Sequence, residues 1–586
     1  MNYTLFHMKN QYKLFNFSLI ILTNMCGITK INLIYYRRKI MIDENGKFYK
    51  PERGSTCSPD HIMLAFCGDA KTRMSVIWRT CTDITEGYIL YRKETEEGWA
   101  RQDAAYATKE TDIDISNYYS VRLSNLEPGT KYVYNVGSDD YRSQNFTFET
   151  EPENLDKFSF IVITDHQKGD PCHLPDYSMV GNMLKDALKK HPECKFIFTA
   201  GDNCDNGQNE VQWNGMFEGL KGIIESMPYM MTTGNHDNRG YITYFPEPTG
   251  KYYLEHADFF DFQFGAAYPD NGPEGYTGEN YSFDYGNTHF LVLGINAPQI
   301  VEDWAYNDLQ SSDKTWKLGA YHFPIYPVMP EGQNNDGYPW LRKPIEDGRL
   351  DILFEGHEHS FARTFPTKND EHFDRPSEGT VHYIVGNGGG NIYHSNAPKV
   401  WHSAFYPQEI RVGSYTLVEI DGDVLTATAY LADGRIIDVF TIDKSKDLIT
   451  PYALAPTYDW TKMAFKGQML ELIARELYAE YKDGMWYAPF GVVAQFIGGK
   501  VIKEKDSLYV EVYGHRATFT QGSNLAKTDL GTVEMKGTPY FVRNQLYVPV
   551  DDSAKMFEME WYHAKRNNFI NWNTPSEDKP LCKHPE

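Results

Sequence analysis

Five short segments of the 586-residue chain combine residue types that bind metal ions and transfer protons. They are Thr164-Asp165-His166-Gln167, Gly201-Asp202-Asn203-Cys204-Asp205, Gly234-Asn235-His236-Asp237, Tyr321-His322-Phe323-Pro324 and Gly356-His357-Glu358-His359. Carboxylate, amide oxygen and imidazole ligands suit first-row cations such as manganese, iron and zinc. The segments together predict a metal site that is built from loops far apart in the chain.

Two metal ions about 3.5–4 Å apart can hold a phosphate group and activate a water molecule between them. Such a pair needs one carboxylate that reaches both ions, and Asp202 is the natural candidate. A histidine that lies beside the ions without binding them can protonate the leaving oxygen. We expect His236 to have this role, because it follows the ligand-type residue Asn235.

Apolar runs precede these segments and predict that each segment follows a buried strand. Residues 158–164 end in the first segment, residues 196–200 precede the second, and residues 350–354 precede the fifth. Near-continuous apolar strands are typical of a sheet that is covered on both faces in an α/β protein. Loops at the ends of such strands often carry function. A helix is predicted over residues 177–191.

The flanking regions predict further domains. Between residues 59 and 151, six short apolar runs separated by polar turns predict a β-sandwich. Within it, residues 126–134 (Leu-Glu-Pro-Gly-Thr-Lys-Tyr-Val-Tyr) resemble the tyrosine corner of fibronectin type III domains. Residues 446–460 predict a linker, residues 463–481 a helix, and residues 461–574 a small α+β domain. Residues 1–58 are expected to be an extension and residues 575–586 a disordered tail.

Composition excludes several classes of protein. Aromatic residues make up 15% of the chain, which requires packed cores and excludes a disordered or collagen-like chain. The net charge of −23, from 57 basic and 80 acidic residues, argues against a protein that coats nucleic acid. An anionic substrate would need a bound cation to reverse the local field. The eight cysteines include no Cys-x-x-Cys pair, and one or two disulfides of unknown pairing stay open.

The N-terminal segment has two interpretations. Residues 14–28 are mostly apolar and follow Lys9 and Lys13, as in the core of a signal peptide. However, no Ala-x-Ala cleavage site follows, and residues 36–39 include three basic side chains. The alternative is a disordered extension ahead of a start at Met41.

In order and residue type, the five segments resemble the calcineurin-like metallophosphoesterase superfamily, and most of all the purple acid phosphatases. The resemblance covers residues 59–445. It implies a purple acid phosphatase N-terminal-like sandwich at 59–151 and a four-layer α-β-β-α catalytic domain at 155–445. It also implies two divalent or trivalent metal ions (iron, manganese or zinc). One is assigned to Asp165 and His359, the other to Asn235, His322 and His357, with Asp202 bridging and His236 as general acid or substrate-positioning imidazole.

Two positions depart from the family pattern, and both concern the first metal. Purple enzymes carry a metal-bound tyrosine three residues after the bridging aspartate, where this chain has Asp205, so the tyrosinate colour should be absent. Asp205 is then either a ligand or a helix cap. Gln167 stands where many superfamily members have a ligand histidine, and it either binds through its amide oxygen or orients a bound water. Asp237 is a further candidate for a ligand or a supporting residue.

Two further features of the sequence lie outside the five segments: a glycine-rich run and a near-repeat close to the C-terminus. Residues 386–390 (Gly-Asn-Gly-Gly-Gly) lack the Lys-Ser/Thr ending of a nucleotide P-loop and are expected to be structural. Residues 486–490 (Trp-Tyr-Ala-Pro-Phe) and 546–550 (Leu-Tyr-Val-Pro-Val) form a near-repeat. The repeat resembles the copper amine oxidase N-terminal-like domain of bacterial surface proteins, without implying copper chemistry. We expect this domain to attach to a cell surface or to pack on the catalytic domain.

The sequence therefore predicts a dinuclear-metal-dependent phosphoester hydrolase. We expect a phosphomonoesterase of the acid phosphatase type, in which a metal-bound hydroxide attacks phosphorus in line and Asn235, His236 and Arg363 contact a phosphate-ester substrate. The alternatives are a phosphodiesterase or nucleotidase on the same site, and a surface binding protein with weakened catalysis. Family resemblance predicts an extracytoplasmic or cell-surface location, whereas an N-terminus that is no signal predicts a cytoplasmic one. The sequence does not fix the oligomeric state.

Overall fold

The computed structural model of the chain describes residues 54–573, apart from 169–174, 239–256, 297, 330–337, 370, 394–395, 397, 400, 409–411, 454–460, 467, 471–476 and 565–568. The predicted tail and most of the predicted N-terminal extension lie outside the described residues. Among the described residues, no helix has the length and apolar character needed to cross a membrane.

The first domain is a β-sandwich of two four-stranded sheets. One sheet has the order β1 (Asp60–Ala65), β2 (Met74–Cys81), β6 (Ile115–Leu123), β5 (Ala105–Glu110), and the other has β4 (Ala100–Asp103), β3 (Tyr88–Lys93), β7 (Lys131–Gly137), β8 (Phe146–Glu149). The sequence did not predict β4 and β5, because these sheet-edge strands are largely exposed and carry little apolar alternation. The hydroxyl of Tyr132 accepts a hydrogen bond from the backbone N–H of Glu127 at 2.9 Å, as expected of a tyrosine corner. The fibronectin type III resemblance itself stays a prediction.

The central domain contains two seven-stranded sheets. The first has the order β11 (Tyr229–Met230), β10 (Cys194–Thr199), β9 (Lys157–Ile163), β21 (Ser414–Asp421), β22 (Val424–Leu431), β23 (Ile436–Asp443), β24 (Leu448–Ala453). The second has the order β12 (Tyr281–Tyr285), β13 (Thr288–Leu293), β14 (Trp316–Tyr321), β15 (Ile352–Glu355), β19 (Val381–Val385), β16 (Phe361–Thr364), β20 (His402–Tyr406). Within each sheet the strands that lead to the five segments run parallel to one another, so their carboxyl ends share an edge.

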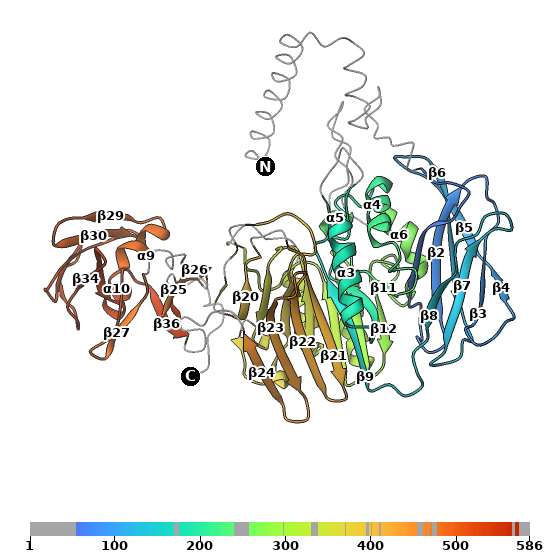
Figure 1. Ribbon diagram of the computed structural model, residues 1–586. Helices are drawn as coiled ribbons and strands as arrows, with labels where there is room; N and C mark the ends of the chain where they lie inside the picture. Colours follow the sequence, from blue (N-terminus) through green and yellow to red (C-terminus); the bar gives the residue numbers. More distant parts are fainter. Residues whose placement is uncertain are drawn as a thin grey trace, which may run out of the picture.

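Aromatic side chains fill the space between the two sheets. The ring of Phe160 on β9 meets Phe290 on β13 edge-to-face, with centroids 5.3 Å apart, and Phe198 on β10 meets Phe354 on β15 at 6.4 Å. Helix α3 (Ser178–Lys190), which was predicted as a helix, packs its buried face on the first sheet. Helices α7 (Gln299–Ser311) and α8 (Tyr338–Asp347) share a core with β13 and β15 of the second sheet. The two sheets and these helices give the predicted four-layer α-β-β-α arrangement. Figure 1 shows this central domain between the sandwich and the C-terminal strands.

The linker and helix predictions near residue 450 are wrong. Residues 448–453 form β24, which pairs antiparallel with β23 at the edge of the first sheet. In the predicted helix, residues 462–465 instead form strand β25 (Lys462–Phe465), which pairs in parallel with β37 (Phe569–Asn573) near the other end of the domain. This distant partner buries Met463 and Ala464, and tertiary pairing thereby overrides the local helical periodicity. Residues 471–476 lie outside the described residues.

The C-terminal domain repeats one local structure, as its sequence predicts. Strand β28 (Met485–Ala488) leads through Pro489 into helix α9 (Phe490–Phe496), and strand β35 (Gln545–Pro549) leads into helix α10 (Val550–Met556). The remaining strands are β26 (Gln468–Met469), β27 (Glu480–Lys482), β29 (Lys500–Lys503), β30 (Ser507–Val512), β31 (His515–Thr520), β32 (Leu525–Thr528), β33 (Gly531–Glu534), β34 (Tyr540–Val542) and β36 (Glu560–Ala564). Ala464 and Phe569 belong to a core cluster with β13 and β15, so the domain packs on the catalytic domain. The copper amine oxidase N-terminal-like resemblance stays a prediction.

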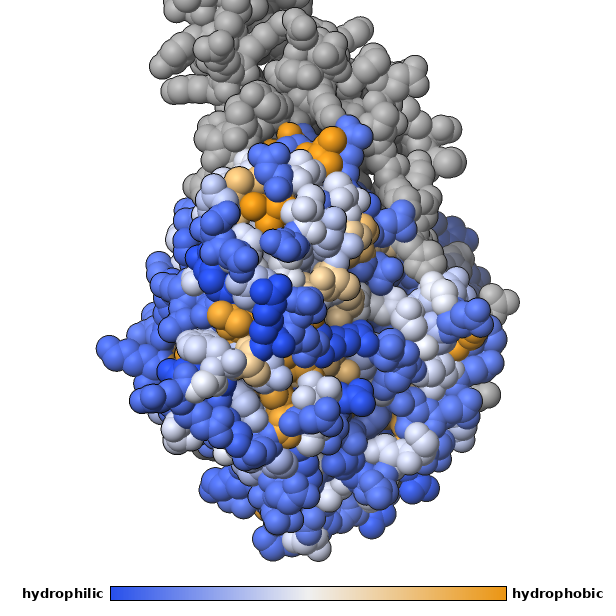
Figure 2. Space-filling view, turned by 90° about the vertical axis from the view of Figure 1, so that its right-hand side faces the viewer, coloured by the Kyte–Doolittle hydropathy of each residue, from blue (hydrophilic) through white to orange (hydrophobic). Residues whose placement is uncertain are grey.

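The face of the molecule at the sandwich end is mainly hydrophilic. Figure 2 shows hydrophilic residues over most of this face, with hydrophobic residues scattered singly or in small groups. Isolated exposed apolar side chains are normal on a folded protein. The described residues on this face therefore form no dominant apolar patch.

Candidate metal centre

The structure brings the five predicted segments together at the shared edge of the two sheets. Two groups of side chains each hold their potential ligand atoms within 4.8 Å of one another. The first group is Asp165, Asp202 and His359, and the second is Asp202, His322 and His357. Asp202 belongs to both groups, which is the position expected of a bridging carboxylate. Apart from His357, which is partly exposed, all of these residues are buried.

Gln167 lies beside the first group. Its amide nitrogen lies 3.0 Å from Oδ2 of Asp202 and 3.2 Å from Nε2 of His359. Nε2 of His359 lies 3.4 Å from Oδ1 of Asp165. Oδ2 of Asp165 and Oε1 of Gln167 are buried without a hydrogen-bond partner. Buried polar atoms are normally satisfied, so these two orphaned oxygens fit a cation that completes the site.

Asn235, at the start of the short helix α5 (Asn235–Asn238), lies beside the second group. Oδ1 of Asn235 lies 3.1 Å from Nε2 of His322 and 3.0 Å from Nδ1 of His357. Nδ1 of His322 contacts the carbonyl oxygen of Ala200 at 2.9 Å. As the N–H donor of that contact, Nδ1 leaves Nε2 directed at the cluster, a common way for proteins to orient a metal-binding histidine.

The backbone is unusual at the ligand-type residues. Four of them adopt left-handed φ angles: Asp165 (49°), Asp202 (54°), His357 (70°) and His359 (51°). Such conformations are rare for residues other than glycine and concentrate at functional sites. Glycines that precede ligand-type residues allow close packing, because a Cβ on Gly234, before Asn235, would lie 2.2 Å from Oδ1 of Asp202, and one on Gly356, before His357, only 2.1 Å from Oγ1 of Thr164. The glycines at the loop entrances are therefore required by space.

The charges of the cluster are strongly coupled. Burial alone would raise the pKa of Asp202, but the positive charges of His322 and His236 bring it below its ordinary value. Burial alone would lower the pKa of His322, but the carboxylate of Asp202 raises it to about 9. The pKa of His357 is lowered by burial and by the charge of His322. Without a metal, the proton on His322 balances the negative charge of Asp202, and a bound metal ion would replace that proton.

His236 lies beside the cluster and is held by Asp205. Nδ1 of His236 is 2.8 Å from Oδ1 of Asp205 and 3.0 Å from its carbonyl oxygen. Nε2 points the other way, 3.8 Å from Oδ2 of Asp202. The second carboxylate oxygen of Asp205 accepts a hydrogen bond from the side chain of Asn206. The sequence offered a ligand or a helix cap for Asp205, and the structure shows a third arrangement, in which Asp205 orients His236.

Asp237 supports the loops. Its Oδ1 accepts hydrogen bonds from the backbone N–H groups of Asn203 and Cys204, both at 3.0 Å, and its Oδ2 accepts one from Gly234 at 2.8 Å. Burial and the nearby charge of Asp202 raise the pKa of Asp237 to about 6. Of the two roles considered from the sequence, the contacts match that of a supporting residue.

The glycine-rich run 386–390 packs against the first metal group. The backbone N–H groups of Gly388 and Gly390 donate to the carbonyl oxygens of Thr164 and Asp165, both at 2.8 Å. Nδ1 of His359 contacts the carbonyl oxygen of Asn391, and the ring of Tyr393 stacks on His359 with centroids 4.5 Å apart. Sequence reasoning missed Asn391 and Tyr393, although the preceding glycines marked a place of close backbone approach. We refer to residues 386–393 as the glycine strap.

Arg363 does not join the cluster. Its Nε and Nη2 donate to the two carboxylate oxygens of Asp438 at 2.6 and 3.1 Å, and its Nη1 donates to Ser403 at 2.7 Å. The guanidinium also lies over the ring of Phe440 at 4.5 Å. Arg363 is almost fully buried. These contacts make it a structural residue between the two sheets, and the predicted substrate contact is corrected accordingly.

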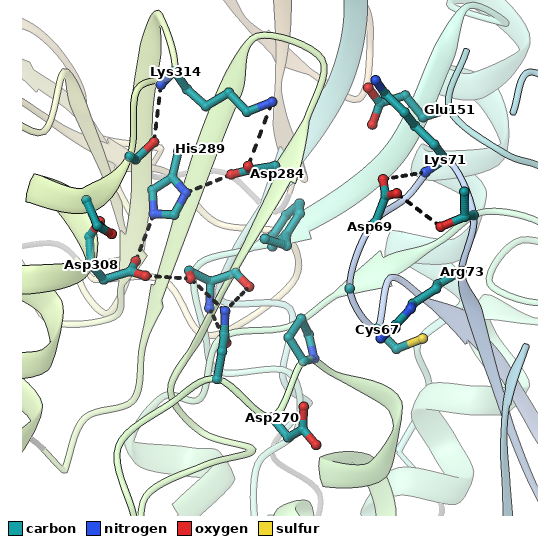
Figure 3. A pocket seen from close by; sticks show the side chains of 18 of the residues that line it. Cys67, Asp69, Lys71, Arg73, Glu151, Asp270, Asp284, His289, Asp308 and Lys314 are labelled. Carbon is teal, nitrogen blue, oxygen red and sulfur yellow. Dashed lines mark hydrogen bonds and ion pairs between the residues drawn. The ribbon is translucent and has the colours of Figure 1, made fainter. Parts of the chain in front are cut away.

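A polar cavity of about 830 Å³ lies elsewhere, between the sandwich and the catalytic domain (Figure 3). None of the cluster residues lines it. On its wall His289 lies between Asp284 and Asp308, with each ring nitrogen 2.8 Å from a carboxylate. Burial would lower the pKa of His289, but hydrogen bonds to the two aspartates raise it to about 9. His289 is thus a charged link between β13 and helix α7.

The donor set fits a pair of first-row metal ions. Carboxylates, an amide oxygen and imidazoles converge from both sheets, and the shared carboxylate is central. Asp165, Asp202, His359 and Gln167 would hold one ion, and Asp202, Asn235, His322 and His357 the other.

Comparison with known proteins agrees with this geometry. The family model of the purple acid phosphatase N-terminal domain matches residues 59–150, and that of the calcineurin-like phosphoesterases matches residues 158–361. Purple acid phosphatase 21 of Arabidopsis thaliana is 22% identical over 342 residues, covering 56% of this chain and 71% of that protein. Probable inactive purple acid phosphatase 27 of the same plant is 23% identical over 374 residues, covering 55% of this chain and 57% of that protein.

A solved structure shows the same fold. The structure of a purple acid phosphatase from yellow lupin (Lupinus luteus) seeds superposes with a TM-score of 0.54 at 19% identity, over 68% of this chain and 78% of that one. Residues 59–150 thus match the purple acid phosphatase N-terminal domain and residues 158–361 match the calcineurin-like phosphoesterases, and the chain is similar to these hydrolases, which act on phosphoester bonds at dinuclear metal centres.

Proposed function

We propose that this chain hydrolyses phosphate monoesters with two bound metal ions. The observation that carries the proposal is the sharing of Asp202 between two groups of ligand atoms, with His236 beside them. The relatives named as purple acid phosphatases support the choice of a monoester. When bound, the two ions would neutralise the phosphate charge and lower the pKa of water enough to supply the nucleophile.

The residues of the chain have distinct roles in this proposal. Asn235 lies between His322 and His357, where its amide can also contact a phosphate oxygen. Asp205 accepts a hydrogen bond from Nδ1 of His236, which fixes the ring and directs Nε2 toward the reacting group. Nε2 would then donate a proton to the departing alcohol, or hold it by a hydrogen bond.

The test compares substrates and variants. The metal-loaded enzyme should hydrolyse p-nitrophenyl phosphate at least roughly tenfold faster than bis-p-nitrophenyl phosphate in the presence of Mn²⁺. Asp202→Asn should lower kcat/KM by about a thousandfold or more, because the shared carboxylate positions both ions. Asp421→Asn is the matched control, since Asp421 is exposed and forms a surface ion pair with Lys157. A reversed substrate preference would instead favour a phosphodiesterase.

A second candidate is a binding protein with weakened catalysis. Some relatives are named probable inactive purple acid phosphatases, and Gln167 and Asp205 replace the histidine and tyrosine that the family pattern has at those positions. Metal analysis separates the two candidates. Two equivalents of metal per chain with turnover that Asp202→Asn abolishes supports the enzyme, whereas less than one equivalent without turnover supports the binding protein.

A further inference from the structure

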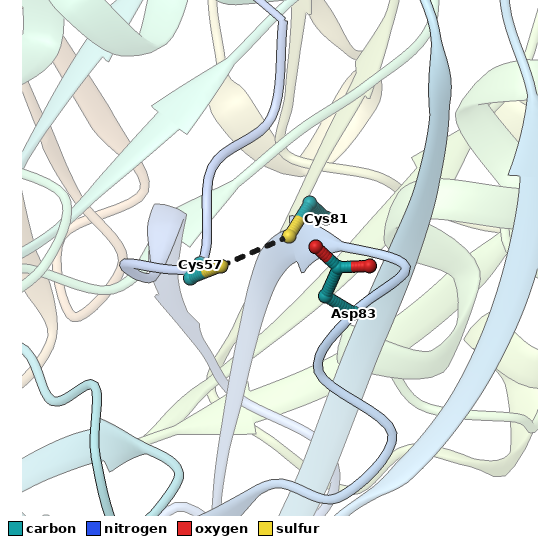
Figure 4. Close-up of side chains that lie close together, drawn as sticks. All are labelled: Cys57, Cys81 and Asp83. Atoms are coloured by element: carbon teal, nitrogen blue, oxygen red, sulfur yellow. Dashed lines mark hydrogen bonds between the residues drawn. The ribbon is translucent and has the colours of Figure 1, made fainter.

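Two cysteines face each other where the described chain enters the sandwich. The sulfur atoms of Cys57 and Cys81 lie 3.3 Å apart (Figure 4). Cys57 precedes β1, and Cys81 is the last residue of β2. The backbone N–H of Cys81 donates to the carbonyl oxygen of Thr56 at 2.8 Å, which holds the incoming segment against the strand. Both cysteines are partly exposed, so a reagent in solution can reach them.

We propose that Cys57 and Cys81 form a disulfide that fastens the segment before β1 to the end of β2. A disulfide bond measures about 2.05 Å, so the two sulfurs need to approach by roughly 1.3 Å. Rotation of the two side chains supplies this movement. The backbone is already in place because the Cys81–Thr56 hydrogen bond fixes the neighbouring residues.

The proposed disulfide can form by thiol–disulfide exchange with a donor disulfide. The thiolate of one cysteine attacks a sulfur of the donor, forms a mixed disulfide and releases one donor thiolate. The thiolate of the second cysteine then attacks the first cysteine and releases the other half of the donor. The two thiol protons pass through solvent to the two donor thiolates, and the donor is reduced by two electrons. An oxidising compartment maintains such a bond, which agrees with the extracytoplasmic alternative for this chain.

A metal ion is the competing occupant of this site. Asp83 lies near the two cysteines and completes a possible group of three ligands within 4.8 Å. The contact with Cys81, burial, and the negative charges of Cys81 and Asp83 together raise the pKa of the Cys57 thiol. A metal needs thiolates, which a raised pKa disfavours. A thiol with a raised pKa is also a poor leaving group, so a disulfide is slow to be reduced. Both effects favour the disulfide.

The bond would act at a domain boundary. Strand β1 lies between the two cysteines in sequence and contacts the catalytic domain, where the N–H of Leu64 donates to the carbonyl oxygen of Ile224 at 3.0 Å. Closing the loop from residue 57 to residue 81 restricts the unfolded chain and stabilises the folded state. The inference concerns stability and does not depend on the proposed catalytic activity.

Peptide mapping under non-reducing conditions tests the proposal. The full chain is treated with oxidised glutathione and digested, and we expect one linked pair of peptides that contains Cys57 and Cys81. Reductant should lower the Tm of the oxidised protein by roughly 5 °C or more. It should leave the Tm of the Cys57→Ser/Cys81→Ser double variant unchanged.

Asp83→Asn is the matched control, because it removes the third possible metal ligand and keeps both thiols. This variant should still form the linked peptide and keep the reductant-sensitive Tm. The zinc content of the zinc-loaded wild type and of the double variant should be equal. Free thiols after oxidation, linkage of either cysteine to another one, or a zinc equivalent that the double variant lacks would each overturn the proposal.

Discussion

Replacing Gly390 with alanine is expected to weaken metal binding at the first group. A Cβ at this position would lie 2.7 Å from Cε1 of His359 and 3.0 Å from the carbonyl oxygen of Asp165. Ordinary contact begins at 3.4 Å, so the ring of His359 must move by 3.4 − 2.7, or 0.7 Å. The ring has little freedom, because Asn391 and Tyr393 of the glycine strap hold its other side.

The displacement can be converted into an expected loss of affinity. Metal–ligand distances tolerate about 0.2 Å, which is less than the required movement. Changes to residues that orient a ligand typically cost tenfold to a hundredfold in metal affinity. We therefore expect Gly390→Ala to bind the ion at the first group (Asp165, Asp202 and His359) about tenfold to a hundredfold more weakly. The affinity for the ion at the second group should change little.

Isothermal titration of the metal-free protein with Mn²⁺ measures both affinities without relying on turnover. Gly98→Ala is the control, because a Cβ there meets nothing within 4 Å. A thermal melt of both variants shows that each is folded. If folded Gly390→Ala binds two ions with the affinity of the wild type, then the glycine strap does not position His359 and the reasoning is refuted.

Three other substitutions have distinct expected results. Asp205→Asn should lower kcat roughly tenfold to a hundredfold with little change in KM or metal content, because it weakens the contact that orients His236, the general acid. Steady-state kinetics on the metal-loaded enzyme tests this, and an unchanged kcat would contradict it. The raised pKa of His289, about 9 against 6.5 in the unfolded chain, should contribute about 3 kcal/mol of stability below pH 6.5 that disappears as pH rises through 9. Denaturant midpoints of the wild type and His289→Asn should accordingly converge at high pH, and a constant gap would contradict this. Arg363→Met should lower the free energy of unfolding in urea by about 3–5 kcal/mol, since Asp438 is left buried without its partner. The KM for substrate should stay unchanged. A large rise in KM would instead show that Arg363 contacts the substrate.

The sequence predicted the part of the site that depends on residue type and strand order. Carboxylate, amide and imidazole residues followed apolar strands, and parallel strands bring their carboxyl ends to one edge. The convergence on Asp202 therefore follows from local patterns. The helix over 177–191 was predicted for the same reason, because its apolar period is local and matches α3.

The remainder depended on contacts that no local pattern encodes. Strand β25 forms because β37, about a hundred residues later, pairs with it and overrides a helical period. Arg363 follows the metal-binding segment in sequence, but Asp438 of the other sheet determines where its guanidinium lies. The contact of Asp205 with His236 likewise joins two loops whose spacing in sequence gives no orientation. Local sequence patterns therefore did not predict which side chains contact one another between separate loops or sheets.

The left-handed backbone at Asp165, Asp202, His357 and His359 has a consequence for protein engineering. Anyone who grafts these side chains onto a regular scaffold would point them in different directions, even with every residue identity preserved. A transplant would have to import the contorted loops and their entrance glycines as a unit. The backbone conformation of the loops is therefore as important to this metal centre as the chemistry of its side chains.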